Sequence, residues 1–263
     1  MKIREIKLNK FKRFTELTIK DIPASAKLVI LVGPNGCGKT SIFEAFNHWY
    51  KYKGFSRWNN DHQSYFVKNG DNDTVGTGLW VDNRVDIIAY DETLNEQNNI
   101  KGKFYFRTAH RNEPDFITRS LSKQDDPKDR IKFETLMVTD SSVSENYQRL
   151  VSNTLSGIFD VNNNGKTVEE LREKLIGKIK QSLSNVFDDL QFSNIGEPLV
   201  NGSFYFTKGR SKNFHYKNLS AGEKSAFDII LDLVIKSDSF DNSVYCIDCH
   251  CSGIYDSCYC NYY

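Results

Sequence analysis

The feature that most constrains the fold of this chain is an eight-residue run, residues 33–40. It matches the phosphate-binding pattern Gly-x-x-x-x-Gly-Lys-Ser/Thr at every defined position. The run follows the β-branched apolar segment 28–32 and precedes segment 41–46. The sequence therefore predicts a strand buried on both faces, a loop and a helix in that order. This context favours a phosphate-binding loop over a glycine-rich turn with a solvated lysine. The loop residues are Gly33, Pro34, Asn35, Gly36, Cys37, Gly38, Lys39 and Thr40.

Each residue type in this loop suits the binding of a triphosphate. The glycines allow the backbone to curl until successive N–H groups point inward, and the following helix adds its positive N-terminal end. Lys39 is expected to bridge the outer phosphates, and the hydroxyl of Thr40 is expected to hold Mg²⁺. Ser41 offers a second, weaker hydroxyl candidate. The loop therefore predicts a nucleoside triphosphate and Mg²⁺ as ligands.

The composition narrows the classes of protein without identifying one. A chain of 263 residues is long enough to bury a core as one large or two-lobed domain. A net charge of +1 gives no global attraction to nucleic acid or to membranes. No apolar run is long enough to cross a membrane, and the first residues contain no apolar secretion signal. We therefore expect a cytoplasmic protein with no membrane partner.

The first half of the chain is expected to be rich in strands. Alternating apolar residues predict a hairpin over residues 3–20, with its turn at residues 10–14, ahead of the phosphate loop. The lysines of this hairpin form either a basic patch or the solvated face of a strand. Further strands are expected at residues 85–90 and 103–107. Three segments without a sustained period are interpreted as connections, at residues 50–78, 92–99 and 124–130.

The second half is expected to begin with helices. The apolar spacing predicts an amphipathic helix at residues 145–159, and Thr167 with Glu170 forms a capping box for a second, long helix. The apolar pattern of the long helix lasts barely three heptads, so a long coiled coil is not supported. The remaining predicted features are an interruption at residues 162–165 and strands around residues 204–206 and 214–216.

A second informative stretch begins at residues 219–224, with the sequence Leu-Ser-Ala-Gly-Glu-Lys. Ser220 and Glu223 form a capping box for an apolar-periodic helix, and taken alone this indicates only a well-started helix. Some twenty residues later the apolar segment 243–247 predicts a strand, and Asp248 follows it. Taken alone, this is a strand that ends in a solvated aspartate.

Together with the phosphate loop, these stretches resemble a known family. Leu-Ser-x-Gly-Glu is similar to the signature sequence of ATP-binding-cassette (ABC) ATPases, and the strand ending in Asp248 resembles their Walker B strand. The resemblance implies that ATP is the nucleotide, that Asp248 positions Mg²⁺ through water, and that Lys39 and Asp248 serve catalysis. It also implies that the hairpin turn reaches the nucleotide, with Lys12 or Arg13 near the ribose or the α-phosphate.

The same resemblance implies an assembly and a fold. Two copies would meet head to tail as a homodimer, in which Ser220, Gly222 and Glu223 of one copy cap the phosphate loop of the other. The expected fold is an α/β P-loop NTPase, an ABC-type ATPase head with an antiparallel β subdomain and a helical lobe. It would form one two-lobed domain over residues 1–263. Its expected parts are the hairpin and phosphate loop (1–50), an insertion and helical lobe (51–218), the signature helix and Walker B strand (219–248) and an atypical cysteine-rich tail (249–263).

The spacing of the motifs selects a branch of this family. About 180 residues separate Lys39 from Ser220, which is too many for a typical transporter cassette. The absence of coiled-coil arms argues against chromosome-maintenance and double-strand-break-repair types. The chain is therefore most similar to compact RecF-like and overcoming-lysogenization-defect (OLD)-like ATPases, which are often found in bacterial antiphage systems.

The family pattern breaks after Asp248, where Cys249 replaces the glutamate that polarises the attacking water. We therefore expect the chain to bind ATP with Mg²⁺ better than it hydrolyses ATP. The segment 249–263 has three interpretations: an altered or out-of-frame tail on a truncated head, a divergent natural end, or a zinc site. The zinc ligands would come from Cys246, Cys249, His250, Cys251, Cys258 and Cys260.

Several partners remain open besides a homodimer or a higher oligomer. The missing glutamate favours a nucleotide-gated scaffold or sensor that holds and releases an effector protein. Binding of nucleic acid is a third hypothesis, with Lys12, Arg107 and Arg111 as candidate contacts, although the two arginines are equally interpreted as structural. The glutamine of the family's glutamine loop cannot be chosen among Gln97, Gln124 and Gln148.

Overall fold

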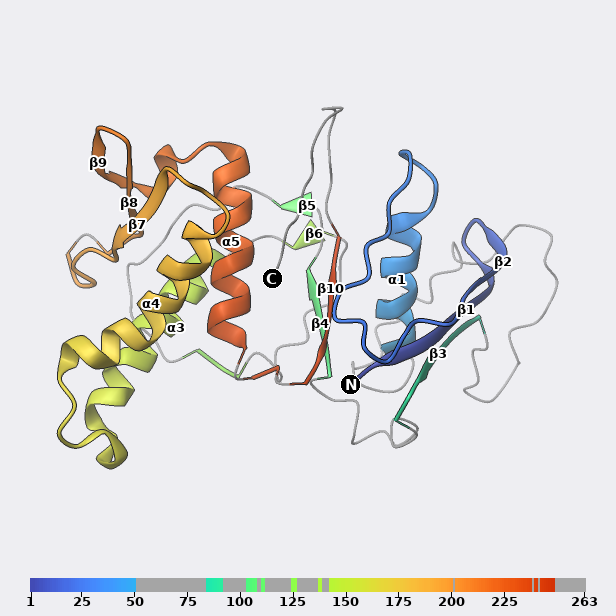
Figure 1. The fold of residues 1–263 in the computed structure, drawn as a ribbon, viewed down its shortest axis with the longest axis horizontal. Helices are drawn as coiled ribbons and strands as arrows, with labels where there is room; N and C mark the ends of the chain where they lie inside the picture. The colour runs from blue at the N-terminus through green and yellow to red at the C-terminus, as the bar shows by residue number, and fades with distance from the viewer. Residues whose placement is uncertain are drawn as a thin grey trace. The chain divides into compact units, whose positions relative to one another are not determined.

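The computed structural model describes residues 1–50, 84–91, 103–107, 110–111, 124–126, 137–138, 142–200, 202–237, 239–240 and 242–248. The chain divides into two compact units. Unit 1 comprises Met1–His110, Lys128–Val138 and Phe240–Cys251, and unit 2 comprises Arg111–Pro127, Thr139–Ser239 and Ser252–Tyr263. The elements, coloured along the chain in Figure 1, are β1 (Ile3–Phe11), β2 (Phe14–Ile19), α1 (Lys39–Tyr50), β3 (Val85–Ala89), β4 (Phe104–Arg107), β5 (His110–Arg111), β6 (Met137–Val138), α3 (Ser142–Phe159), η4 (Val161–Asn163), α4 (Val168–Ser184), β7 (Leu190–Asn194), β8 (Tyr205–Lys208), β9 (Ser211–His215), η5 (Tyr216–Asn218), α5 (Ala221–Lys236) and β10 (Val244–Ile247).

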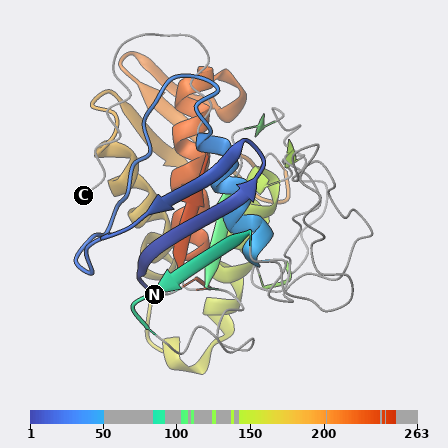
Figure 2. The ribbon, with the colours of Figure 1, turned by 90° about the vertical axis from the view of Figure 1, so that its right-hand side faces the viewer.

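Unit 1 contains an antiparallel sheet in the order β2-β1-β3, which confirms the predicted hairpin. Leu8 of β1 is the register partner of both Leu17 on β2 and Val85 on β3. Apolar side chains alternate with polar ones along β1, so one face of the sheet is buried and the other is solvated. Figure 2 shows the three strands side by side, with α1 along the sheet. The buried face of the sheet and α1 form one apolar core.

The outer face of this sheet carries mixed charge. Lys7 forms an ion pair with Glu5 at 3.4 Å and is the register partner of Asp86 on β3. Asn9 is the register partner of Glu16 on β2. Among the described residues, this face therefore fits the solvated side of a strand better than a uniform basic patch.

A second, parallel pair of strands in unit 1 joins distant parts of the chain. β10 pairs with β4, with Val244 opposite Phe104 and Ile247 opposite Arg107. Strands were predicted at both places. The pair is anchored by aromatic rings, because Phe104 lies 5.6 Å from Trp49 and 5.7 Å from Tyr50 of α1, measured between ring centroids.

Met1 is hydrogen-bonded to the segment that leads into β10. The amino group of Met1 donates a hydrogen bond to the carbonyl oxygen of Asn242 at 3.0 Å, two residues before β10 begins. Unit 1 is therefore closed by segments that lie more than two hundred residues apart in the sequence.

The predicted strand at residues 28–32 is wrong. The segment belongs to no strand, and its five apolar side chains are between 42% and 88% exposed. A strand exists only where a neighbour supplies backbone partners, and none of the described strands pairs with this segment. The predicted burial on both faces is therefore wrong as well, because an apolar pattern does not form a buried strand without a pairing partner.

Unit 2 packs three helices against an antiparallel sheet in the order β7-β8-β9. The helices α3, α4 and α5 and the strands β7 and β8 contribute to one apolar core. At its centre the ring of Phe227 lies 5.0 Å from Phe204 and 4.9 Å from Phe206, centroid to centroid. The helices predicted from apolar spacing are confirmed, as is the capping box of Thr167 and Glu170 at the start of α4. Strand β7 was not predicted.

None of the described helices is both long and apolar enough to cross a lipid bilayer.

Candidate nucleotide-binding site

The phosphate loop is a tight turn that leads directly into α1. The N–H of Cys37 donates to the carbonyl oxygen of Pro34 at 3.2 Å, and the N–H of Ile42 donates to that of Gly38 at 3.1 Å. Gly36 and Gly38 have φ angles of 80° and 107°, a region that side chains with a Cβ rarely adopt. A Cβ on Gly38 would also collide with the ring of Phe14. The loop thus requires glycine at these two positions for backbone reasons.

Lys39 lies across this turn. Its ammonium group donates to the carbonyl oxygens of Gly33 at 2.7 Å and Pro34 at 2.9 Å, and lies 3.8 Å from the sulfur of Cys37. The loop's own carbonyls therefore hold the cation at the mouth of the turn. Phosphate oxygens are stronger acceptors for an ammonium group, so a bound triphosphate would compete for it.

The start of α1 fits an anion and a hard cation. Its first turn contains no acidic residue, so its N-terminal N–H groups and positive dipole end meet no negative side chain of that turn. Thr40 is exposed and Ser41 is half-buried at this end of the helix. Their hydroxyl oxygens are the type of ligand that Mg²⁺ prefers. These residues therefore fit a magnesium triphosphate.

The hairpin turn between β1 and β2 contacts the loop. Arg13 donates from its guanidinium to the carbonyl oxygen of Gly36, while the preceding residue, Lys12, forms an ion pair with Glu44 of α1. Glu44 is buried, with 5% of its side chain exposed. Burial lowers the pKa of Lys12, because desolvation disfavours its ammonium form. The two basic residues of the turn therefore have different partners.

Asp248 follows the carboxyl end of β10. Its N–H donates to the carbonyl oxygen of Arg107 at 2.9 Å, which extends the ladder between β10 and β4 by one step. In Figure 1 the carboxyl end of β10 and the amino end of α1 point toward the same end of unit 1. Ligands of α/β sheets bind at the carboxyl ends of parallel strands, so Asp248 lies at the expected edge. Arg107 is buried, which favours the structural interpretation of this residue.

The start of α5 lies in unit 2 and has a different character. Ser220 caps the helix by accepting from the N–H of Glu223, and the Glu223 carboxylate accepts from the N–H of Ser220 at 2.8 Å. Ser220 and Gly222 are exposed, and no described atom lies within 4 Å of a Cβ built on Gly222. Ser220 and Gly222 are therefore accessible at the start of α5.

Glu223 is paired with a cation from β8. Lys208 donates to it at 2.7 Å and also forms an ion pair with Asp189 at 3.5 Å. The hydrogen bond from Lys208, together with the one from the Ser220 backbone, lowers the pKa of Glu223 to about 2. Glu223 is therefore ionised at neutral pH.

Buried acids fix the rest of α5 in unit 2. The hydroxyl of Tyr216 donates to Asp228, with 3.0 Å to each carboxylate oxygen. Asp232 accepts from Asn146 of α3 at 2.6 Å and forms an ion pair with Lys236 at 2.6 Å. These bonds hold the body of the helix while its first turn stays open to solvent.

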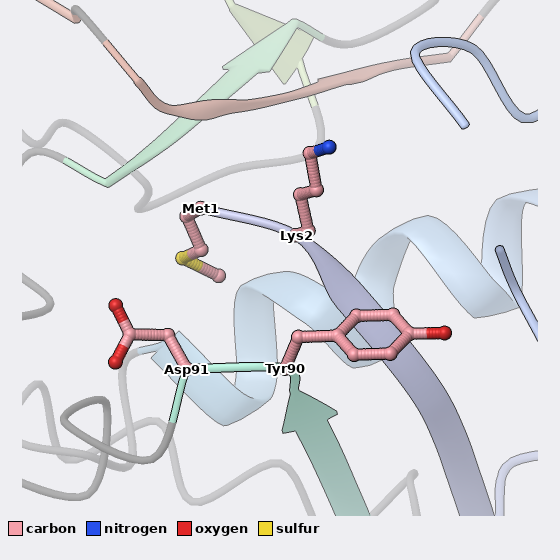
Figure 3. Close-up of a pocket in the computed structure, with 4 residues that line it drawn as sticks. All are labelled: Met1, Lys2, Tyr90 and Asp91. Carbon is pink, nitrogen blue, oxygen red and sulfur yellow. The ribbon is translucent and has the colours of Figure 1, made fainter. Parts of the chain in front are cut away.

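A surface hollow elsewhere in unit 1 does not coincide with the phosphate loop. It has a volume of about 450 Å³ and is lined by Met1, Lys2, Tyr90 and Asp91, at the end of β1 away from the hairpin turn. Figure 3 shows the side chains of Lys2 and Asp91 pointing away from each other. The hydroxyl of Tyr90 is bonded to the carbonyl oxygen of Ile22 at 2.7 Å. The lining groups therefore do not converge on a ligand.

The remaining predicted residues have mixed outcomes. Gln124 donates to Gln148 within unit 2, whereas Gln97, Cys249 and the other tail cysteines lie outside the described residues. Burial raises the pKa of the Cys246 thiol above its ordinary value. Among the described residues, no group of three or more His, Cys, Asp or Glu side chains is placed to hold a metal ion. The zinc site of the tail therefore stays a prediction.

Two residues of the site were not found from the sequence. Glu44 is a lone carboxylate within the apolar run 42–46, and this is a usable signal, because such a residue is rarely buried without a partner. Lys208 carries no comparable signal. Its pairing with Glu223 depends on how β8 packs beside α5.

Comparisons with known proteins cover most of the chain. A family model described as an AAA domain (AAA_23) matches residues 5–242. A segment of 45 residues is 47% identical to the chromosome partition protein Smc of Bordetella petrii. This segment is 17% of the present chain and 4% of the Smc protein, so the similarity spans a small part of that relative's length.

Proposed function

Because this chain belongs to the AAA domain family, we propose that it is an ATP-binding ATPase subunit of the SMC and RecF type. The observation that carries the proposal is the geometry of the phosphate loop. Two glycines at positive φ close the turn, and Lys39 lies across its carbonyls at the start of a helix without acidic residues in its first turn. This combination of backbone donors, helix dipole and cation suits a triphosphate.

Each loop residue has a proposed role. The backbone of residues 33–38 cradles the phosphates, and Lys39 pairs with the β- and γ-phosphates. Thr40 and Asp248 serve Mg²⁺, with Ser41 as a secondary hydroxyl, and Arg13 lies toward the nucleotide. When bound, Mg²⁺ neutralises charge on the phosphates.

We further propose that the chain is an ABC-type head that dimerises around ATP. Ser220 and Gly222 are exposed at the start of α5, and the space around Gly222 is open among the described residues. This accessibility is what a helix end needs if it is to meet the triphosphate held by a second copy. Two such sites in a head-to-tail pair would be related by two-fold symmetry.

Hydrolysis is proposed to be slow. Cys249 follows Asp248 in the sequence, at the position where the resembling family has a water-polarising glutamate. Phosphoryl transfer to water needs a positioned nucleophile in addition to charge neutralisation. The proposed setting is antiphage defence or DNA maintenance, based on the resemblance to compact RecF-like and OLD-like ATPases.

The first test is equilibrium binding of a fluorescent ATP analogue, with and without Mg²⁺, combined with light scattering to measure mass. We expect magnesium-dependent binding and a doubling of the mass with ATP. Failure to bind would overturn the proposal as a whole, whereas binding without a change in mass would overturn the dimer alone.

A second candidate function is a nucleotide-gated scaffold that holds an effector protein. Cys249 in place of the glutamate favours it, because a scaffold needs ATP binding more than turnover. Affinity purification from the native host, in parallel with Lys39→Ala, tests this function. A second protein that is retained by the parent and lost from the variant supports the scaffold, and the same proteins with both would exclude it.

A further inference from the structure

The turn between β1 and β2 has an unusual backbone. Lys10 and Lys12 have φ angles of 50° and 53°, the left-handed region that residues other than glycine enter only at an energetic cost. Such a conformation persists only where surrounding contacts over-determine it. The contacts that maintain this conformation therefore indicate which side chains the turn is built to position.

Contacts on both sides of Arg13 hold the turn against α1 and the phosphate loop. Phe11 is fully buried, and its ring lies 5.6 Å from that of His48 on α1. Lys12 forms its ion pair with Glu44, and the two side chains are 18% and 5% exposed. Phe14 lies directly against Gly38 of the loop. The turn is therefore fixed on both sides of Arg13.

Of the residues in these contacts, the buried Glu44 depends most on its partner, Lys12. A carboxylate with 5% of its side chain exposed is costly unless a cation compensates it, so Lys12 is drawn inward toward α1. Lys12 forms an ion pair with Glu44, whereas the exposed Arg13 donates a hydrogen bond to the phosphate loop, at the carbonyl oxygen of Gly36.

We propose that Glu44 is a positioning residue of the nucleotide site, which acts through Lys12 to hold the Arg13 guanidinium at the phosphate loop. Lys12 is then a structural link, and Arg13 is the cation of the turn that meets the nucleotide. The inference rests on the proposed function, since it assumes that the loop binds a triphosphate. It assigns different roles to two adjacent basic residues that the sequence alone leaves equivalent.

The test is a double-mutant cycle on the affinity for the fluorescent ATP analogue with Mg²⁺. Arg13→Gln is expected to weaken binding about tenfold, as for the loss of one charge-assisted hydrogen bond. Glu44→Gln is expected to weaken it by a similar factor in the parent background and by no more than about twofold in the Arg13→Gln background. A merely structural role of Glu44 would give independent, multiplicative losses, and that result would overturn the proposal.

A second variant covers the case in which Glu44→Gln does not fold. The pair Lys12→Met with Glu44→Met replaces the ion pair by apolar side chains of similar length, a change that buried pairs often tolerate. It is expected to fold and to lose affinity as Arg13→Gln does, and parent-like affinity would overturn the proposal. Lys180→Met, which removes an exposed ion pair with Glu173 on α4, is the matched control and is expected to leave affinity unchanged. A parent that binds no nucleotide would instead contradict the proposed function.

Discussion

The sequence motifs identify two helix starts, at α1 and at α5. They differ in whether side chains of the same helix end accept hydrogen bonds from the first N–H groups. At α1 the helix follows a glycine turn and has no acidic residue in its first turn. At α5 the side chains of Ser220 and Glu223 satisfy the helix end, and Lys208 balances the carboxylate. A helix end that keeps its donors available is suited to a phosphate of its own chain. A capped end is stable alone and must exchange a carboxylate contact before it accepts a phosphate.

The largest expected effect concerns the cation at α1. Lys39→Ala should weaken binding of the ATP analogue by about a hundredfold, because it removes the ammonium group that is proposed to pair with the phosphates. The unfolding midpoint should change little, since the lost bonds go to carbonyls of an exposed loop. Fluorescence titration measures the affinity. Undiminished binding would mean that the start of α1 is not the phosphate site of its own chain.

The next effect concerns the capped start. Ser220→Arg should leave nucleotide affinity of the single copy unchanged while abolishing the ATP-dependent increase in mass, because a long side chain fills the exposed helix end. Ser220→Ala is the matched control, since it loses the cap, at a cost of about 1 kcal/mol, without adding bulk. Light scattering with and without ATP separates the two variants. A dimer that persists in Ser220→Arg would mean that α5 does not face a second copy.

Replacing one glycine at each helix start by alanine tests whether the two backbones differ as described. Gly38→Ala should destabilise the protein by about 1–3 kcal/mol, because φ is 107° and the ring of Phe14 occupies the site of the new methyl group. Gly222→Ala should be neutral or stabilise α5 by up to about 1 kcal/mol, because the space there is open and alanine favours a helix. Urea unfolding measures both changes, and equal effects would contradict the described backbone difference.

The smallest effect is a dependence on pH at the capped start. The pKa of Glu223 is lowered from 4.5 to about 2, so its stabilising contribution is present above pH 4.5 and is lost as pH falls toward 2. The difference in unfolding midpoint between the parent and Glu223→Gln should therefore shrink between about pH 6 and about pH 3. Thermal unfolding across this range measures it, and a constant difference would show that the charge of Glu223 is not involved.

Local signals in the sequence predicted much of the fold. The hairpin, α1, α3 and both capping boxes follow from patterns within a few residues, and the structure contains them. The strand at residues 28–32 failed because strand formation depends on a partner that the local pattern does not specify. The short strand β7 gave too few alternating residues to stand out after a long helix.

The candidate site was predicted by motif and completed only by tertiary structure. The loop and Asp248 have sequence patterns, since their chemistry fixes the residue types at fixed spacing. Glu44 and Lys208 act through partners 32 and 15 residues away in the sequence, which only the packing of the hairpin and of β8 brings close. The sequence could not decide whether Lys12 or Arg13 contacts the loop. Both are basic residues of the same turn, and only the tertiary structure shows where each side chain points.

The joining of β4 with β10, and of Met1 with Asn242, has a consequence for biosynthesis. The strand that leads to Asp248 is translated some two hundred residues after the phosphate loop. Unit 2, in contrast, has most of its core within one continuous stretch that precedes β10. A nascent chain can therefore fold unit 2 before β10 has been translated, whereas the pairing of β4 with β10 in unit 1 must wait for β10.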